Sequence, residues 1–182
     1  PGDRLEVKPG DSRVISKIFA RTGGPGLGPG PGGVTDDGRL VAVPGWQRGA
    51  TFDEPVVAAA GSLEDGSLVV GTGHPARLYR VRGDASELLA EVPGEQVTAI
   101  LVSPNDRVFV ASISPGALYR VEGKRLEEVA RLEQGGIWDL AWFDGSLVAA
   151  GGVPAVLYKL GERGLERWRE LPDAHARSLE VT

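Results

Sequence analysis

The chain carries few side chains whose type and spacing could perform chemistry. Its two histidines are His74 and His175, and it has no cysteine, so it offers no thiol nucleophile, disulfide or thiolate metal ligand. A zinc site takes three or four converging protein ligands, and two histidines far apart in the chain do not supply them. The serine elbow G-x-S-x-G is also missing. The sequence therefore predicts no catalytic residue, no metal and no cofactor.

The histidines and tryptophans are instead candidates for ligand binding. If the segment around Trp138 and Trp142 is a β-strand, alternation places both rings on one side, where they would form a platform for a sugar ring or a peptide. The competing interpretation is packing between neighbouring structural units. For the histidines, surface or loop-structuring roles stay open. The ligand-binding candidates are His74, Trp138 and His175.

A glycine-rich segment, GGPGLGPGPGG at 23–33, contains a nominal G-x-G-x-x-G at Gly28, Gly30 and Gly33. A phosphate cradle needs successive backbone N–H donors and usually a following helix. Two prolines inside the motif remove donors, and the next element has the pattern of a strand. The segment is therefore predicted to be a loop.

A repeat of about forty residues organises the chain. Aligning Tyr79, Tyr119 and Tyr158 brings LYRV, LYRV and LYKL into register at spacings of forty and thirty-nine positions. Each repeat contains four short apolar runs, rich in Val, Leu, Ile and aromatic residues, which favour strands. Four strands in a unit of this length is the pattern of a β-propeller blade. In the second repeat the runs are Val97–Ser103, Val108–Ser112, Ala117–Val121 and Leu126–Leu132.

The fold prediction is all-β: a partial β-propeller of four-stranded antiparallel blades, three complete and a fourth begun. Residues 1–53 form an N-terminal region with strands predicted in SRVISKIFA and GRLVAV, either the remains of an earlier blade or a cover for the first one. Since the chain contains no Met, we expect a processed or truncated piece of a longer protein, with open blade faces. The blades are predicted at 54–94, 95–135, 136–173 and, incomplete, 174–182.

Acidic turn residues recur between the first and second strands of each repeat. Asp65-Gly66 and Asp144-Gly145 occupy the same turn, with Asn105-Asp106 as its variant. Asp, Asn and Gly suit the backbone of tight hairpins. These carboxylates are therefore predicted to shape turns and not to act in catalysis.

The segment GGIWDLAWFDGSLVAAGGVPAVLYKL resembles blades of the two-component-regulator and NHL/YVTN type. More narrowly, GGVTDDGRLVAVP, IWDLAWFDGSLVAAGG and HARSLEVT, in that order, resemble a group of uncharacterised, exported bacterial β-propeller proteins. The resemblance covers most of the chain from Gly33 onward. It implies a propeller fold and a periplasmic or extracellular location, and it brings no activity. The chain departs from tryptophan–aspartate repeats, because no unit carries their G-H and W-D pairs.

These features predict a non-catalytic scaffold or binding module that presents a loop-lined face to a protein, peptide or glycan. The alternative is a lactonase-like propeller hydrolase or lyase whose metal ligands lie partly outside this chain. Net charge is −5 with no basic stripe, so a nucleic acid is not an expected partner. No apolar run is long enough for a membrane span. Self-association through open blade faces is a third expectation.

Overall fold

The computed structural model describes residues 32–34, 40–42 and 49–181. The chain divides into two compact parts, Pro1–Arg48 and Gly49–Thr182, and each is described by itself. In the N-terminal part, β1 (Gly32–Val34) pairs antiparallel with β2 (Leu40–Ala42), so the strand predicted in GRLVAV is present. The strand predicted in SRVISKIFA and most of the glycine-rich segment lie outside the described residues.

Residues 49–181 form twelve strands and no helix, so this part is all-β. The described residues accordingly contain no helix that is long and apolar enough to cross a membrane. The strands follow one another as three four-stranded antiparallel units, each a meander in chain order. The first unit contains β3 (Val56–Ser62), β4 (Leu68–Gly73), β5 (Arg77–Arg82) and β6 (Ala85–Glu91). The second contains β7 (Gln96–Val102), β8 (Val108–Ile113), β9 (Ala117–Glu122) and β10 (Arg125–Arg131). The third contains β11 (Ile137–Phe143), β12 (Ser146–Gly151), β13 (Val156–Gly161) and β14 (Gly164–Glu170).

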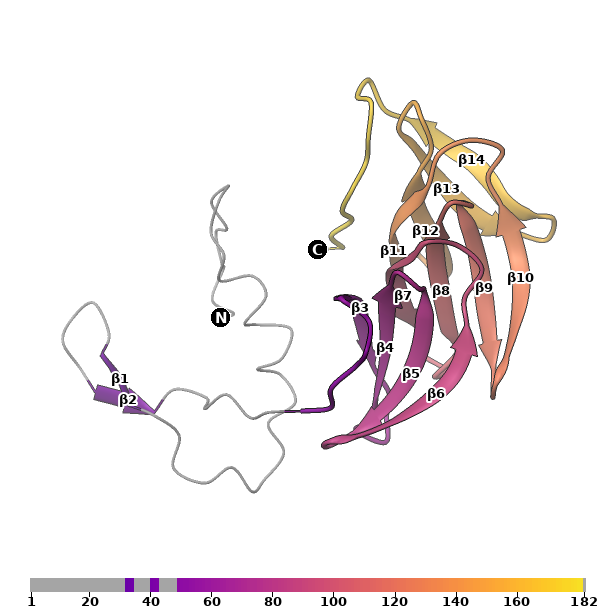
Figure 1. The fold of residues 1–182 in the computed structure, drawn as a ribbon. Helices are drawn as coiled ribbons and strands as arrows, with labels where there is room; N and C mark the ends of the chain where they lie inside the picture. Colours follow the sequence, from indigo (N-terminus) through magenta and orange to yellow (C-terminus); the bar gives the residue numbers. More distant parts are fainter. Residues whose placement is uncertain (1–31, 35–39, 43–48, 182) are drawn as a thin grey trace. The chain divides into compact units, whose positions relative to one another are not determined.

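The strands predicted for the second repeat are confirmed to within one residue at each end. The first and second units are joined into one sheet by a single bridge, Gly73 to Gln96. The first strands lie next to one another, β3 beside β7 and β7 beside β11, while the fourth strands are less closely packed (Figure 1). The units therefore spread apart from their first strands to their fourth.

The predicted hairpin turns are present between the first and second strands. Asp144 and Gly145 both have positive φ, 48° and 71°, as a tight two-residue hairpin requires. Gly66 has φ 79° and Asp106 has φ 57°. A backbone in this region favours Gly, Asp and Asn, which explains the recurring residue types.

Two hydrophobic clusters hold the units together, one between each neighbouring pair. Tyr119 of the second unit packs with Val69 and Leu78 of the first. Tyr158 of the third unit packs in the same way with Phe109 and Leu118 of the second. We call the side of a unit that meets the next unit its forward face, and the opposite side its backward face. The repeated tyrosine therefore belongs to the backward face.

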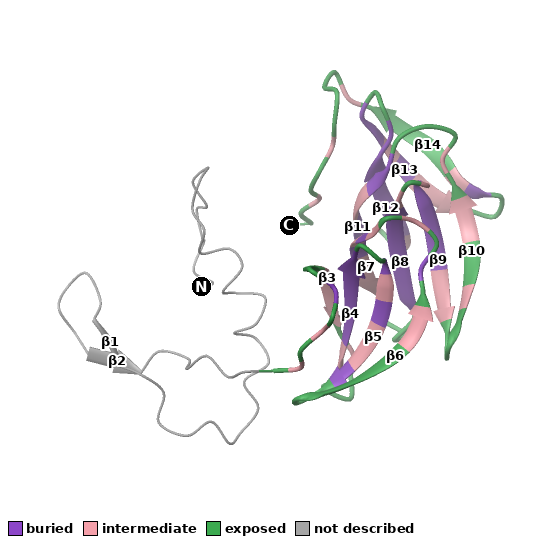
Figure 2. Cartoon of the chain, viewed as in Figure 1, coloured by how far each residue is buried: buried purple, intermediate pink, exposed green. Residues whose placement is uncertain are grey.

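Burial follows the order of strands within each unit. The second strands β4, β8 and β12 each bury five of their six residues, whereas the fourth strands are largely exposed (Figure 2). The second strands have a paired strand on each side and at least one face covered by a neighbouring unit, so little of them reaches water and their sequences are nearly continuous apolar runs.

The opening strand predicted at 174–182 is not formed in the described residues 174–181. This segment runs beside β11, where the Leu179 N–H donates to Asp139 Oδ2 at 2.7 Å. A strand needs a ladder of backbone hydrogen bonds, and no second strand pairs with this segment within the described part.

Candidate functional site

The loops between second and third strands and the connections between units meet at one end of the fold, which we call the loop end. The His74 N–H donates to the Glu95 carbonyl, and the Glu95 N–H donates in turn to Ile113, both at 3.0 Å. The Leu132 N–H donates to the Gly116 carbonyl at 2.8 Å. In the third unit, the equivalent Leu171 N–H donates to the Ala155 carbonyl at 3.0 Å. The loop end comprises residues 74–76, 92–95, 114–116, 132–136, 152–155 and 171–175.

Buried hydroxyl groups fix the shape of two of these loops. Thr72 Oγ1 donates to the Pro75 carbonyl at 3.2 Å and accepts the Arg77 N–H at 3.1 Å. Ser112 Oγ donates to the Pro115 carbonyl at 3.0 Å. Both hydroxyl residues are fully buried, so hydrogen bonds from side chains of the second strands fix the backbone of these loops.

His74 lies at this end, and its side chain is exposed. Its backbone has φ 59°, and Ser114 holds the same place in the second unit with φ 53°. Since serine does the same backbone task, the structural role of His74 does not require an imidazole. No group of three His, Cys, Asp or Glu residues that could hold a metal is present among the described residues.

Trp138 sits at a β-bulge of β11, and the bulge changes its surroundings. The pairing register skips one residue between Ile137 and Asp139, so simple alternation does not hold there. Trp142 packs on the hydrophobic cluster between the second and third units. The Trp138 ring instead lies under the Arg177 guanidinium, 4.7 Å from its centre, and its buried Nε1 has no hydrogen-bond partner. The two rings do not share one platform.

His175 lies in the segment 174–181, exposed and outside any strand. The neighbouring Asp173 carbonyl accepts the Ala155 N–H at 3.2 Å, which attaches the start of the segment to the loop end. Trp138 and His175 therefore belong to the third unit and its C-terminal extension, and His74 belongs to the first unit. No hydrogen bond or ring contact within the described residues joins any two of the three candidates.

A buried polar cluster that the sequence did not predict lies where the chain enters the first unit. Glu54 Oε1 accepts hydrogen bonds from Arg77 Nη1 and the Tyr79 hydroxyl, both at 2.8 Å. The Phe52 ring lies 5.0 Å from the Tyr79 ring. Arg77 occupies the position held by alanine and valine in the other units, and this departure from the repeat was the available signal.

The ionisation of Glu54 reflects two opposing effects. Burial acts to raise the pKa of its carboxyl, but hydrogen bonds from Tyr79 and Arg77 outweigh burial, so the pKa lies below its ordinary value. Burial and the neighbouring carboxylate raise the pKa of Tyr79. Glu54 therefore stays ionised at neutral pH, and its second oxygen, Oε2, is buried without a partner.

Within residues 49–181, large exposed apolar side chains occur in the first unit and in the third unit with its extension, and none occurs in the second unit. Val57 is 48% exposed, whereas Val97 and Ile137, its equivalents in the next two units, are fully buried. Trp168 is 45% exposed, and its equivalents Leu89 and Val129 pack on the inter-unit clusters. Across 49–181 the large exposed apolar residues are Val56, Val57, Leu88, Phe143, Val153, Trp168 and Val181.

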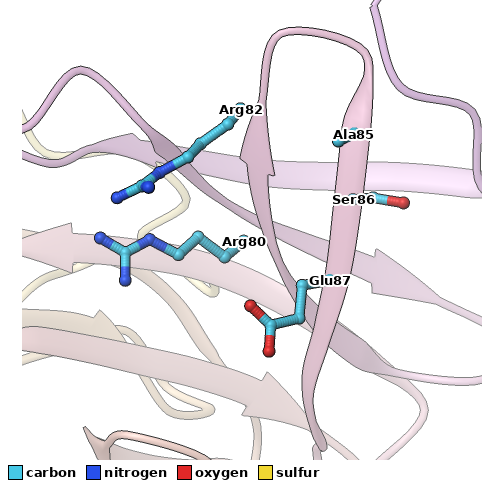
Figure 3. A pocket seen from close by; sticks show the side chains of 5 residues that line it. All are labelled: Arg80, Arg82, Ala85, Ser86 and Glu87. Carbon is cyan, nitrogen blue, oxygen red and sulfur yellow. The ribbon is translucent and has the colours of Figure 1, made fainter.

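Two hollows of about 220 Å³ lie beside the hairpins between third and fourth strands. The first hollow lies in the first unit and the second hollow at the equivalent place in the second unit. Figure 3 shows Arg80 and Arg82 of β5 extending side by side in the first hollow, with Glu87 on the neighbouring strand β6. The first hollow is lined by Arg80, Arg82, Ala85, Ser86 and Glu87, and the second by Glu122, Arg125, Leu126 and Glu127.

Comparison with known proteins gives little about function. No protein-family model and no curated protein matches the chain. The chain is similar to the crystal structure of a protein of unknown function from Bacteroides caccae, with 18% identity and a TM-score of 0.48. The match covers 76% of this chain and 52% of that one, so the chain spans about half its length. This likeness carries no argument about activity.

Proposed function

We propose that the three units are blades of a β-propeller and that the chain acts as a non-catalytic scaffold that binds a protein partner. Support for the blades comes from the four-stranded meanders in chain order and from first strands that lie side by side. Each unit also packs face to face with its neighbour through an apolar cluster. These are the relations that a radial array of sheets requires.

One observation carries the scaffold function: Val57, Leu88 and Trp168 are exposed on the outward faces of the end units, while within residues 49–181 no large apolar side chain of the middle unit is exposed. Val57 lies on the backward face of the first unit, in the position that is fully covered in the other two units. Leu88 lies on the same face, because it pairs across the strands with Tyr79. Exposed apolar surface of this kind marks a place where another protein surface packs.

The loop end is the second binding surface of the scaffold. His74 and His175 are exposed there, and Trp138 stacks with Arg177 beside it. Their chemistry suits a peptide or a glycan, with aromatic stacking and imidazole hydrogen bonds.

Self-association tests the end faces, because a second copy supplies a protein surface of matching character. We expect light scattering to show a mass that rises with protein concentration. Val57→Glu and Trp168→Glu should each lower that mass, whereas Arg125→Glu, on the exposed fourth strand of the middle unit, should not. A wild-type chain that stays monomeric at high concentration would refute self-association through the end faces.

The loop end is tested separately by tryptophan fluorescence. A panel of saccharides and peptides should include ligands that quench the wild-type emission, and Trp138→Phe should remove this response while His74→Ala and His175→Ala weaken it. Silence across the whole panel would count against the loop end as a ligand surface, whatever the end faces do.

A further inference from the structure

The first hollow is cationic, and its arginines are held in place by the turn beside them. Asp65 Oδ2 accepts hydrogen bonds from Arg80 Nη2, at 2.7 Å, and from Arg82 Nη2. Arg80 Nε donates to Ser67 Oγ at 3.1 Å, and Ser67 is almost fully buried. Since Ser67 in turn binds Asp65 through both its N–H and its hydroxyl, the turn forms a fixed base for the two guanidinium groups.

Donor groups of both arginines remain for a ligand. A guanidinium carries five N–H donors in a planar fork, and the bonds to Asp65 and Ser67 use few of them. The third charged group of the hollow, Glu87, pairs with Lys124 Nζ of the second unit at 2.8 Å. Lys124 thus balances Glu87, and Asp65 balances one of the two arginines, so the hollow keeps one positive charge.

The second hollow has the same position in the repeat but the opposite charge. Arg120, the equivalent of Arg80, does not line this hollow and pairs with Glu122, at 3.0 Å, and Glu127, at 2.5 Å. Glu122 stands where the first unit has Arg82. Two acidic residues and one arginine line the second hollow, against two arginines and one acidic residue in the first. The cationic pair is thus a property of the first unit and not of the repeat.

We propose that the first hollow binds an oxyanion, a sulfate, phosphate or carboxylate group on a small ligand, between Arg80 and Arg82. Paired guanidinium groups match the geometry of such anions and form charge-assisted hydrogen bonds with them. The volume of about 220 Å³ lies below the range of drug-sized pockets, so it suits a single anionic group or one acidic sugar. This inference does not depend on the propeller interpretation.

NMR titration with inorganic sulfate tests the site at constant low ionic strength, because screening by salt weakens exposed charges. Saturable shifts are expected for Arg80, Arg82 and their neighbours in the wild-type chain. Parallel titrations with phosphate and acetate identify which oxyanion is preferred. Linear, non-saturating shifts with all three anions would overturn the proposal.

The second hollow supplies matched variants. Arg82→Glu places in the first hollow the glutamate that the second hollow has at position 122, and it should abolish saturable binding. Arg82→Gln should weaken anion binding about tenfold, as loss of one charge-assisted hydrogen bond does. Glu122→Arg should create a second saturable site in the second hollow. Arg163→Glu makes the same charge change on a turn of the third unit and should leave binding unchanged. Equal weakening by Arg82→Glu and Arg163→Glu would reduce the effect to net charge and refute a site.

Discussion

A leucine recurs at one position in the third strand of every unit, and its burial shows how far the forward face of that unit is covered. Leu78 and Leu118 are fully buried against the next unit, whereas Leu157 on the last unit is half-buried. We expect Leu78→Ala and Leu118→Ala to destabilise the fold strongly and Leu157→Ala to do so weakly. The three substitutions remove the same atoms from equivalent strands, so only the surroundings differ.

The expected magnitudes follow from the burial. Leu→Ala removes three carbon atoms, worth about 2.4 kcal/mol in a fully buried site at roughly 0.8 kcal/mol each. A closed cavity adds about 1 kcal/mol where the surroundings do not collapse. Leu78→Ala and Leu118→Ala should therefore cost about 3 kcal/mol each in free energy of unfolding. Leu157→Ala leaves no closed cavity and loses part of the transfer term, so it should cost about 1 kcal/mol.

Urea unfolding followed by far-ultraviolet circular dichroism and tryptophan fluorescence measures these differences. Coincident transitions by the two probes establish that the units unfold together, which a repeat array does not guarantee. With a slope of roughly 2 kcal/mol per molar urea, the midpoint of Leu118→Ala should lie about 1 M below that of Leu157→Ala. If the alanine variants do not fold, Leu→Val at the same three positions preserves the order. Equal losses at Leu118 and Leu157 would refute an open forward face on the third unit.

Three further predictions concern the polar cluster around Glu54, the contact between Gly71 and Val97, and the C-terminal segment 174–181. Folding lowers the pKa of Glu54, so the ionised carboxyl contributes its full stabilisation above the ordinary pKa of 4.5, and this is lost as the pH falls through the folded pKa. Glu54→Gln should therefore make the melting temperature fall less steeply with acid. An unchanged dependence of melting temperature on pH would contradict this. A methyl group built at Gly71 overlaps Val97 of the next unit, so Gly71→Ala should cost about 2 kcal/mol in unfolding free energy, and Val97→Ala should cost less in that background than alone. Asp139→Ala removes the acceptor of the Leu179 N–H, and limited proteolysis should cut 174–181 faster than in the wild type, with cutting at the β9–β10 turn as the internal reference.

The strands and turns could be predicted because the repeat presents each pattern three times. Asp144-Gly145 predicted a hairpin, and both residues have the positive φ that explains their types. The tyrosines aligned the repeats, and two of them, Tyr119 and Tyr158, lie in the equivalent clusters between units. Local residue preference and global position agree at these sites, which is why sequence reasoning succeeds there.

The candidate site could be predicted only in part, because two of its features depend on the course of the backbone. Trp138 and Trp142 have the spacing of a shared strand face, but a bulge at Trp138 inserts one residue into the pairing. Nothing in the residue types marks this bulge, which recurs at the same place in the first strands of the other units. The bonds of Glu54 join residues more than twenty positions apart, and no periodicity encodes such a contact.

The repeat also provides an internal comparison for the end faces. Val57, Val97 and Ile137 share one backbone position, and all three are aliphatic although only Val57 is exposed within the described part of the chain. A position that faced water in the working protein would be free to carry a charged residue, and an exposed aliphatic cluster promotes association. The aliphatic residue at 57 is explained if that face is covered by another protein surface when the protein works. The same reasoning applies to Trp168, whose equivalents are also apolar and packed, so the two ends of the array are expected to bind and the middle unit to join them.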